Sequence, residues 1–448
     1  MKMLTEFFGA AILIAVVMAV SARAGAAEKT YVPGKPPLQT GTMGGVDNPT
    51  KEVLLAMHRS QYILHARAGK LTKVPAEKTW LPPDRAGANH QEIMGRLAMA
   101  GDGTVYMHGR DYMCKSTDGG RTWTSFLHDQ EIGADFIQVL KDGTHIAVRI
   151  DSGDETGGEQ AGIWSSSDEG RNWRKIARIE RPTKFEGREY EQWWGISPLY
   201  VLPDGTVLWA VHLTKPDRPR GDYADPEKYY KDDPPWKRVL VIYRSSDGGK
   251  TWQGPSHFAD WCSEGGITHT ASGKLLAALR YKRAVLPDDP PGLAEQIVAQ
   301  NPSNIRVARS DYYKHIFLTE SVDGGRTWIN FRQLSTVFGQ CYGYPAALPD
   351  GRVVLVHTTP YGPGPRGSRA MISYDEGQTW EDETYYLTFS EIGGYNQSVV
   401  LKDGTILTVA ARQDFLADKQ RPSETFVAIR WKPVKRESGD AAPDRTGR

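Results

Sequence analysis

The eight residues STDGGRTW, from Ser116 to Trp123, return four more times along the chain. The later copies, which we call Trp phrases together with the first, are SSDEGRNW ending at Trp173, SSDGGKTW at Trp252, SVDGGRTW at Trp328 and SYDEGQTW at Trp380. A phrase that recurs every roughly 50 to 80 residues indicates a repeat architecture, in which each copy marks one supersecondary unit.

A second repeat alternates with the Trp phrases and consists of a short turn between two apolar runs. Gly provides the positive φ that such a turn needs, so each copy predicts a hairpin with a two-residue turn. The six copies have their turns at Asp102-Gly103, Asp142-Gly143, Asp204-Gly205, Ser272-Gly273, Asp350-Gly351 and Asp403-Gly404.

The order of the two repeats predicts the fold. Each of the first five hairpins is followed by an apolar strand, a Trp phrase and a short strand, so the unit has four antiparallel strands. Such units repeated radially form a β-propeller. We therefore predict an all-β fold, a six-bladed β-propeller of four-stranded antiparallel blades. The sixth unit lacks its fourth strand, and we expect an N-terminal strand from VLLAM (53–57) or SQYILHA (60–66) to close the ring.

Composition and the N-terminus narrow the class of protein. The chain has 448 residues, with 55 Lys and Arg against 54 Asp and Glu, so no field of one sign favours nucleic acid or an anionic membrane. Lys2, the apolar run FFGAAILIAVVMAV (7–20) and the small residues after it are typical of a secretory signal peptide. An uncleaved anchor is the alternative, but the run is shorter than the ~20 residues of a membrane span. We expect an exported protein, periplasmic or extracellular, without membrane contact in its mature form.

These features divide the chain into four parts. We predict a signal peptide at 1–27, an N-terminal segment with the ring-closing strand at 28–91, the propeller at 92–432 and a disordered polar tail at 433–448. Cys262 and Cys341 stand at equivalent points of neighbouring repeats, either as a disulfide or as two buried thiols. No cluster of Cys and His has the spacing of metal ligands, so we expect no metal motif and no cofactor.

The Trp phrase resembles the Asp-box, or BNR repeat, of the sialidase (neuraminidase) superfamily, whose members are six-bladed propellers. The resemblance extends from about Glu92 to Trp431. We expect the Asp side chain to bind amides of its own turn and the Trp to pack between blades, so the phrase is structural. Both kinds of turn then lie on one face of the ring, and the functional site lies on the opposite face.

Topology selects the polar residues of that opposite face. They lie ahead of the first strand of a blade, or just past the second strand. The first group comprises Arg96, Glu264, Tyr342, Tyr344, Tyr395 and Asn396, and the second comprises His108, Arg110, Arg149, His212, Arg280, His357 and Arg412. Two long connections, 215–237 and 283–314, open on the same face and are expected to wall the site.

The resemblance implies roles for several of these residues. Sialidases bind the sugar carboxylate with three arginines, for which Arg96, Arg280 and Arg369 stand here, with Arg366 as a competitor for the third. They use a Tyr nucleophile activated by a Glu, matched by Tyr395 and Glu264. A neutral Tyr suits a sugar whose anomeric carbon carries a carboxylate, because a carboxylate nucleophile would be repelled.

The acid/base position departs from the family pattern. The loop between the first hairpin and the first Trp phrase is only HGRDYMCK, so Asp111 is the local candidate, with Asp151 and Asp154 as substitutes from the next unit. Of the neighbours Trp193 and Trp194, one is expected to stack on a sugar while the other packs inward, and we take Trp193 as the candidate for the sugar contact. His212, His357 and Tyr344 are further candidates for substrate contact.

Three functions remain open at this point. The first is an exported exo-glycoside hydrolase that removes a terminal acidic sugar with retention. The second is a propeller enzyme that cleaves a uronic-acid glycan by hydrolysis or β-elimination, using His212, His357 or Tyr344. The third is a propeller that binds carbohydrate without catalysis.

Overall fold

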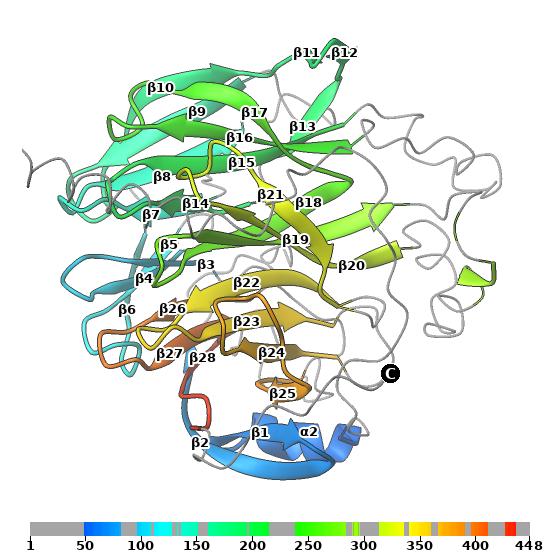
Figure 1. Ribbon diagram of the computed structural model, residues 1–448. Coiled ribbons are helices and arrows are strands. Elements are labelled where there is room, and N and C mark those ends of the chain that lie inside the picture. Colours follow the sequence, from blue (N-terminus) through cyan, green and yellow to red (C-terminus); the bar gives the residue numbers. More distant parts are fainter. Residues whose placement is uncertain are drawn as a thin grey trace, which may run out of the picture.

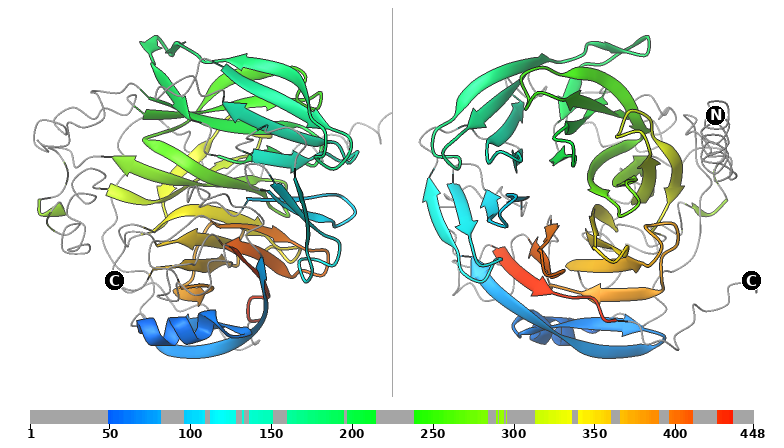
Figure 2. Two further views of the ribbon diagram at one scale, coloured as in Figure 1. Left: turned by 180° about the vertical axis from the view of Figure 1, so that it is seen from behind. Right: turned by 60° about the vertical axis from the view of Figure 1, so that its left-hand side comes forward.

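The computed structural model describes most of the expected propeller. The described residues are 49–81, 96–108, 112–127, 132, 136–150, 160–194, 197–214, 238–283, 289, 291–293, 295, 313–335, 340–359, 366–389, 396–410 and 426–435. Antiparallel sheets are arranged in a ring, seen from its end in the right-hand view of Figure 2, while Figure 1 labels the elements. The fold is an all-β propeller of antiparallel, mostly four-stranded blades.

Four blades stand as separate sheets. The first has β3 (Arg96–Met99), β4 (Val105–His108), β5 (Tyr112–Ser116) and β6 (Thr124–Leu127). The second has β7 (Phe136–Val139), β8 (His145–Ile150), β9 (Gln160–Ser166) and β10 (Arg174–Glu180). The third has β13 (Gln192–Trp194) and β14 (Leu199–Val201), both paired with β15 (Val207–Thr214), then β16 (Arg238–Ser245) and β17 (Gln253–Asp260). The fourth has β18 (Cys262–His269), β19 (Leu275–Arg283), β20 (Tyr313–Ser321) and β21 (Ile329–Gln333).

The remaining blade strands form one nine-stranded sheet, so the count of separate blades is four and not the expected six. Its order is β22-β23-β24-β25-β1-β2-β28-β27-β26. The strands are β22 (Cys341–Ala347), β23 (Val353–Thr358), β24 (Ser368–Ser373), β25 (Glu383–Tyr386), β26 (Asn396–Val400), β27 (Ile406–Ala410) and β28 (Phe426–Trp431). A small ribbon of β11 (Lys184–Phe185) and β12 (Arg188–Glu189) stands apart.

An N-terminal hairpin joins the two halves of that nine-stranded sheet. β1 (Tyr62–Arg67) pairs with β25, and β2 (Lys70–Leu81) pairs with β28. Neither expected segment therefore pairs with β28: residues 60–66 belong largely to β1, and residues 53–57 lie in helix α2 (Lys51–His58). The pairing of β2 with β28 could not be predicted from the sequence, because β2 begins with exposed, charged residues. Only its later half alternates buried with exposed residues. Whether this hairpin is the predicted ring closure stays a prediction.

The six hairpin turns have three residues instead of the expected two. In the first, the Ala100 N–H donates to the Thr104 carbonyl at 2.9 Å, and the Gly103 N–H donates to the Ala100 carbonyl at 3.0 Å. Gly103 has φ +100°, as in a turn followed by a left-handed residue. Asp102 accepts the Thr104 N–H at 2.8 Å, which explains why Asp precedes the Gly.

The Trp phrases form the same turn five times, as expected. In the first, the Ser116 hydroxyl donates to Asp118 at 2.8 Å and accepts the Gly120 N–H, while the Thr122 N–H and hydroxyl donate to the Asp118 carboxylate. The Trp123 indole donates to the Gly120 carbonyl at 3.0 Å. These bonds satisfy the carboxylate locally, so the phrase is a structural turn.

Each Trp of these phrases packs against the preceding unit. Trp173 joins a buried cluster with Met113 of β5, and Trp328 contacts Phe258 of β17 at a ring distance of 4.3 Å. A side chain on Gly249, beside Trp252, would collide with Ile146 of the second blade, so the close packing requires glycine there. The cysteines 114, 262 and 341 are free, buried thiols, so Cys262 and Cys341 form no disulfide. No helix among the described residues is long and apolar enough to cross a membrane.

Candidate active site

A bulge in β18 positions the first functional side chain. Cys262 pairs with Tyr281 and Gly265 pairs with Leu279, so Ser263 and Glu264 together face the single residue Arg280 of β19. Bulges redirect side chains and occur often beside active sites. Here the bulge brings the Glu264 carboxylate against the Arg280 guanidinium. Both residues thus lie at one end of the blade.

The Glu264–Arg280 pair is almost fully buried. Burial by itself raises the pKa of Glu264, but the charge of Arg280 and a hydrogen bond from the Ser263 hydroxyl outweigh it and lower the pKa to about 2. Glu264 is therefore a carboxylate at neutral pH. A buried ion pair of this kind is costly to desolvate, so it marks a functional site more often than a stability device.

The next blade repeats the bulge. Cys341 pairs with Thr358 and Tyr344 with Val356, which leaves Tyr342 and Gly343 opposite His357. The Arg280 guanidinium lies 4.8 Å from the Tyr342 ring centroid, a cation–π contact between β19 and β22. Tyr342 thus forms part of the candidate site, although the family pattern assigns it no role. Its φ of +57° is unusual for a residue with a bulky side chain, and such strain is frequent at functional sites.

Tyr344 and Arg96 extend this group across the ring. Burial and the charge of Glu264 raise the pKa of Tyr344, while Arg96 of β3 acts in the opposite direction. Both charges are therefore near enough to affect the phenol. Arg96 also lies over the Phe136 ring at 5.3 Å, which holds its guanidinium between the first two blades. Two of the three predicted clamp arginines thus lie by tyrosines of β22, Arg280 by Tyr342 and Arg96 near Tyr344.

The third blade contributes His212 and a tryptophan. Trp193 is fully buried and packs edge-on against Trp209 at 5.8 Å, so it belongs to the core and not to the substrate surface as predicted. Its neighbour Trp194 points the opposite way, because adjacent strand residues alternate. Trp194 stacks on His212 at 6.5 Å with an interplanar angle of 24°.

His212 is a neutral imidazole beside Glu264. Burial lowers its pKa to about 3, and this outweighs the nearby Glu264 charge, which acts to raise it. Its Nδ1 is buried without a hydrogen-bond partner among the described residues. A neutral imidazole with an open nitrogen can donate or accept one hydrogen bond, so His212 suits contact with a sugar hydroxyl.

Arg369 and His357 form a second group at the seam of β23, β24 and β25. They pair across the ladder, and Arg369 lies over the Tyr386 ring at 4.9 Å. Burial, followed by the charge of Arg369, lowers the pKa of His357 to about 3. Asn396, which follows the predicted nucleophile, is buried and donates to the Ser368 hydroxyl at 3.4 Å. Asn396 therefore contacts the residue that precedes Arg369.

Several residues predicted for the site have contacts away from the Glu264–Arg280 pair, and others lie outside the part of the chain that the structure describes. His108 accepts the Ile137 N–H through Nε2 at 3.1 Å, and Arg149 donates to the Ile132 carbonyl at 3.0 Å, so both connect backbone segments. Arg366 is partly buried. Residues outside the described part of the chain are Tyr395, Asp111, Arg110, Arg412, Asp151 and Asp154. Among the described residues no cluster of three or more His, Cys, Asp or Glu side chains is able to hold a metal.

Comparisons with known proteins show similarity in the fold alone. No protein-family model matches the chain, and no curated protein matches it. An α-L-arabinofuranosidase of Fusarium graminearum is similar in structure with a TM-score of 0.49 and 12% identity, over 79% of this chain and 96% of that chain. A Hadza microbial sialidase has a TM-score of 0.47 and 15% identity, over 76% of this chain and 65% of that chain.

A Dyadobacter fermentans protein of unknown function is also similar, with a TM-score of 0.46 and 17% identity, over 76% of this chain and 94% of that chain. The solved structures that this chain resembles thus include sialidases and arabinofuranosidases. At this level of similarity, the chemistry of the site has to be inferred from the residues of this chain.

Proposed function

We propose that this chain is an exported exo-glycoside hydrolase that removes a terminal acidic sugar with retention of configuration. The observation that carries the proposal is the buried Glu264–Arg280 pair, with Arg96 near enough to act on the adjacent Tyr344. The excess of guanidinium groups over carboxylates in this group favours an anionic ligand, and the planar fork of Arg binds a carboxylate in a bidentate manner.

Arg96, Arg280 and Arg369 would bind the sugar carboxylate in this proposal. Arg280 is already paired with Glu264, so it would hold the ligand and the catalytic carboxylate at once. Trp194, stacked on His212, offers an aromatic surface to the sugar ring, and the neutral His212 offers a hydrogen bond to a hydroxyl.

The chemical steps use Tyr395 and Asp111. The Tyr395 phenol oxygen attacks the anomeric carbon while its proton passes to Glu264. The glycosidic C–O bond breaks, and Asp111 protonates the departing oxygen. Water then attacks the anomeric carbon, giving its proton to Asp111, and the tyrosine leaves and regains its proton from Glu264. Both displacements invert the anomeric carbon, so the product retains its configuration.

The test is turnover of a fluorogenic α-sialoside by protein that starts at Glu28. We expect wild-type protein to release the fluorophore and Tyr395→Phe to lose at least about 10³-fold in turnover, because the covalent step disappears. Equal urea midpoints of the two proteins would show that the fold is intact. Undiminished turnover by Tyr395→Phe would overturn the nucleophile, and no release by wild type would overturn the sialoside substrate.

A second candidate rests on the two neutral histidines. His212 and His357 have pKa values lowered to about 3 by burial, so both imidazoles are unprotonated at neutral pH and each has a nitrogen lone pair. A uronic-acid glycan could then be cleaved by β-elimination, with a histidine taking the proton next to the carboxylate. That reaction leaves a product with a new carbon–carbon double bond. Ultraviolet absorbance after incubation with a uronate oligosaccharide distinguishes it from hydrolysis.

A further inference from the structure

A cavity of about 440 Å³ runs along the axis of the ring, apart from the candidate active site. Its wall is built from the innermost strands β3, β7, β14, β18, β22 and β26 and from the turns at Gly103, Lys141, Pro203 and Lys402. These turns lie at the end of the blades opposite Glu264. Glu264 and the clamp arginines do not line the cavity. Its volume is in the range of small-molecule pockets, roughly 300–1,000 Å³.

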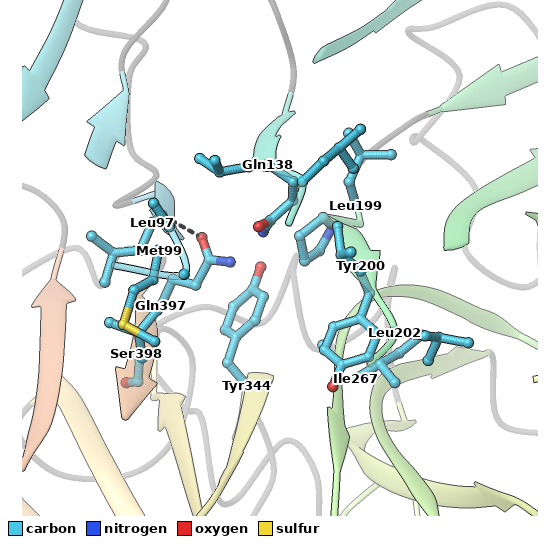
Figure 3. A pocket seen from close by; sticks show the side chains of 18 of the residues that line it. Leu97, Met99, Gln138, Leu199, Tyr200, Leu202, Ile267, Tyr344, Gln397 and Ser398 are labelled. Carbon is cyan, nitrogen blue, oxygen red and sulfur yellow. Dashed lines mark hydrogen bonds between the residues drawn. The ribbon is translucent and has the colours of Figure 1, made fainter. Parts of the chain in front are cut away.

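Three uncharged polar groups converge inside this cavity. The side chains of Gln138, Tyr344 and Gln397 come from three different strands and point toward one another, as Figure 3 shows. The Gln397 Oε1 accepts the Leu97 N–H at 2.7 Å, which turns its Nε2 amide toward the cavity. Two amides and a phenol can each donate a hydrogen bond to a ligand, and the Gln138 carbonyl and the phenol oxygen can accept one.

The charged groups of the cavity are confined to its rim. Among the described residues that line it, only Lys141 and Lys402 are charged. Their ammonium groups donate to backbone carbonyls of neighbouring turns, Lys141 to Pro203 and Lys402 to Asp102 at 2.9 Å. The described residues inside the cavity therefore provide no counter-charge to an ion, and an uncharged ligand has the lower desolvation cost.

Most of the rest of the wall is apolar, although Tyr200 and Ser398 also line it. Leu97 and Met99 of β3, Leu199 and Tyr200 of β14 and Ile267 of β18 surround the three polar groups, as Figure 3 shows. A ligand that combines hydroxyl groups with C–H faces matches this mixture, because the amides bind the hydroxyls while the apolar walls cover the C–H surface.

We propose that the axial cavity is a second binding site, for an uncharged monosaccharide or polyol of similar size. Tyr344 separates this site from the candidate active site: its hydroxyl enters the cavity, while Glu264 and Arg96 act on the same phenol. The proposal does not depend on the proposed hydrolase activity. A bound sugar would also share Tyr344 with the candidate active site, which gives the two sites a direct physical connection.

Saturation-transfer NMR with D-galactose, L-arabinose and glycerol as probes, followed by calorimetric titration, tests this proposal. We expect at least one probe to bind with a Kd of roughly 1 mM. Gln138→Leu keeps the size of the side chain and removes its hydrogen bonds, so it should weaken binding about tenfold. The matched control is Gln253→Leu, an exposed glutamine on β17 that lies outside the cavity and should leave binding unchanged.

Two further comparisons separate the cavity from the candidate active site. D-galacturonate should bind more weakly than D-galactose, because a carboxylate finds no counter-charge inside. Trp194→Ala, which changes only the candidate active site, should leave D-galactose binding unchanged. No binding of any probe at 50-fold the expected Kd, or binding lost in Trp194→Ala and kept in Gln138→Leu, would overturn the proposal. Both assays measure binding alone, so they stay informative if turnover is never found.

Discussion

The two ends of the blades hold carboxylates in opposite ways. At one end, hydrogen bonds from the Asn172 backbone and side chain and from the Ser166 hydroxyl lower the pKa of Asp168 to about 2. At the other end Glu264 also has a pKa of about 2, but burial opposes ionisation, and the charge of Arg280 on another strand overcomes it. The Asp is satisfied by its own turn, whereas the Glu depends on a counter-charge from another strand.

This difference separates structural from functional residues. The turn of Asp168 recurs five times with the same bonds, and water reaches it, so each copy stabilises its own blade. Glu264 and Arg280 occur once, in a bulged strand, next to a neutral histidine and a tyrosine from other blades. Repetition along the sequence therefore indicates the fold, and a residue that interrupts the repeat indicates the site.

The largest effect is expected from removing the counter-charge of Glu264. Arg280→Met leaves a buried carboxylate without its counter-charge and should lower the free energy of unfolding by about 3–5 kcal/mol. Glu264→Gln combined with Arg280→Met should cost less than Arg280→Met alone, because the isolated charge is gone. Urea denaturation of the two single variants and the double variant measures this. A double variant that is less stable than Arg280→Met would contradict the pairing.

The second-largest effect is expected in the pH dependence of stability, from His357, which is buried at the same end of the blades as Glu264. His357 has a pKa of about 3 in the folded protein against an ordinary value of 6.5, so between these values only the unfolded chain binds the proton. Stability should therefore fall as the pH drops from about 6.5 toward 3, by about 1.4 kcal/mol per pH unit for this group. His357→Gln removes that contribution. The urea midpoint between pH 7 and pH 4 should then depend less steeply on pH than in wild type, and an identical slope would exclude His357 as a source.

The smallest effect is expected from a repeated turn. Asp168→Ala removes the acceptor of three hydrogen bonds, but water can replace it. The free energy of unfolding should therefore fall by roughly 1–2 kcal/mol. Asp168→Asn keeps part of the acceptor and should cost less. Neither variant should change sugar binding. If Asp168→Ala lowered the free energy of unfolding as much as Arg280→Met does, the proposed difference between the two ends of the blades would be wrong.

The sequence predicts the blades well because their turns are local. Asp102 binds an amide two residues away and Asp118 binds groups within four residues, so a short window of sequence contains the whole interaction. The partner of β28 could not be found in this way. β2 lies more than 300 residues away and begins with exposed, charged residues, so no local pattern connects the two strands.

The candidate site was partly predictable for the same reason. The positions of Glu264 and Arg280 follow from hairpin topology, because both lie at one end of adjacent strands. The choice between Trp193 and Trp194 depends on which face of β13 meets the core, and two adjacent tryptophans give no periodicity from which to decide. Gln138 and Gln397 could not be predicted as neighbours, because they belong to two separate blades. Only the folded chain brings them together at the axis.

The pairing of β2 with β28 also sets an order on biosynthesis. The Arg430 guanidinium of β28 donates to Glu77 of β2 at 3.1 Å, so β2 has to wait for a strand that is made more than 300 residues later. Four blades can assemble while the chain emerges, but this sheet cannot complete until β28 is synthesised. Contacts of such large sequence separation slow folding. The pairing of β2 with β28 is therefore expected to be a late and slow step of folding.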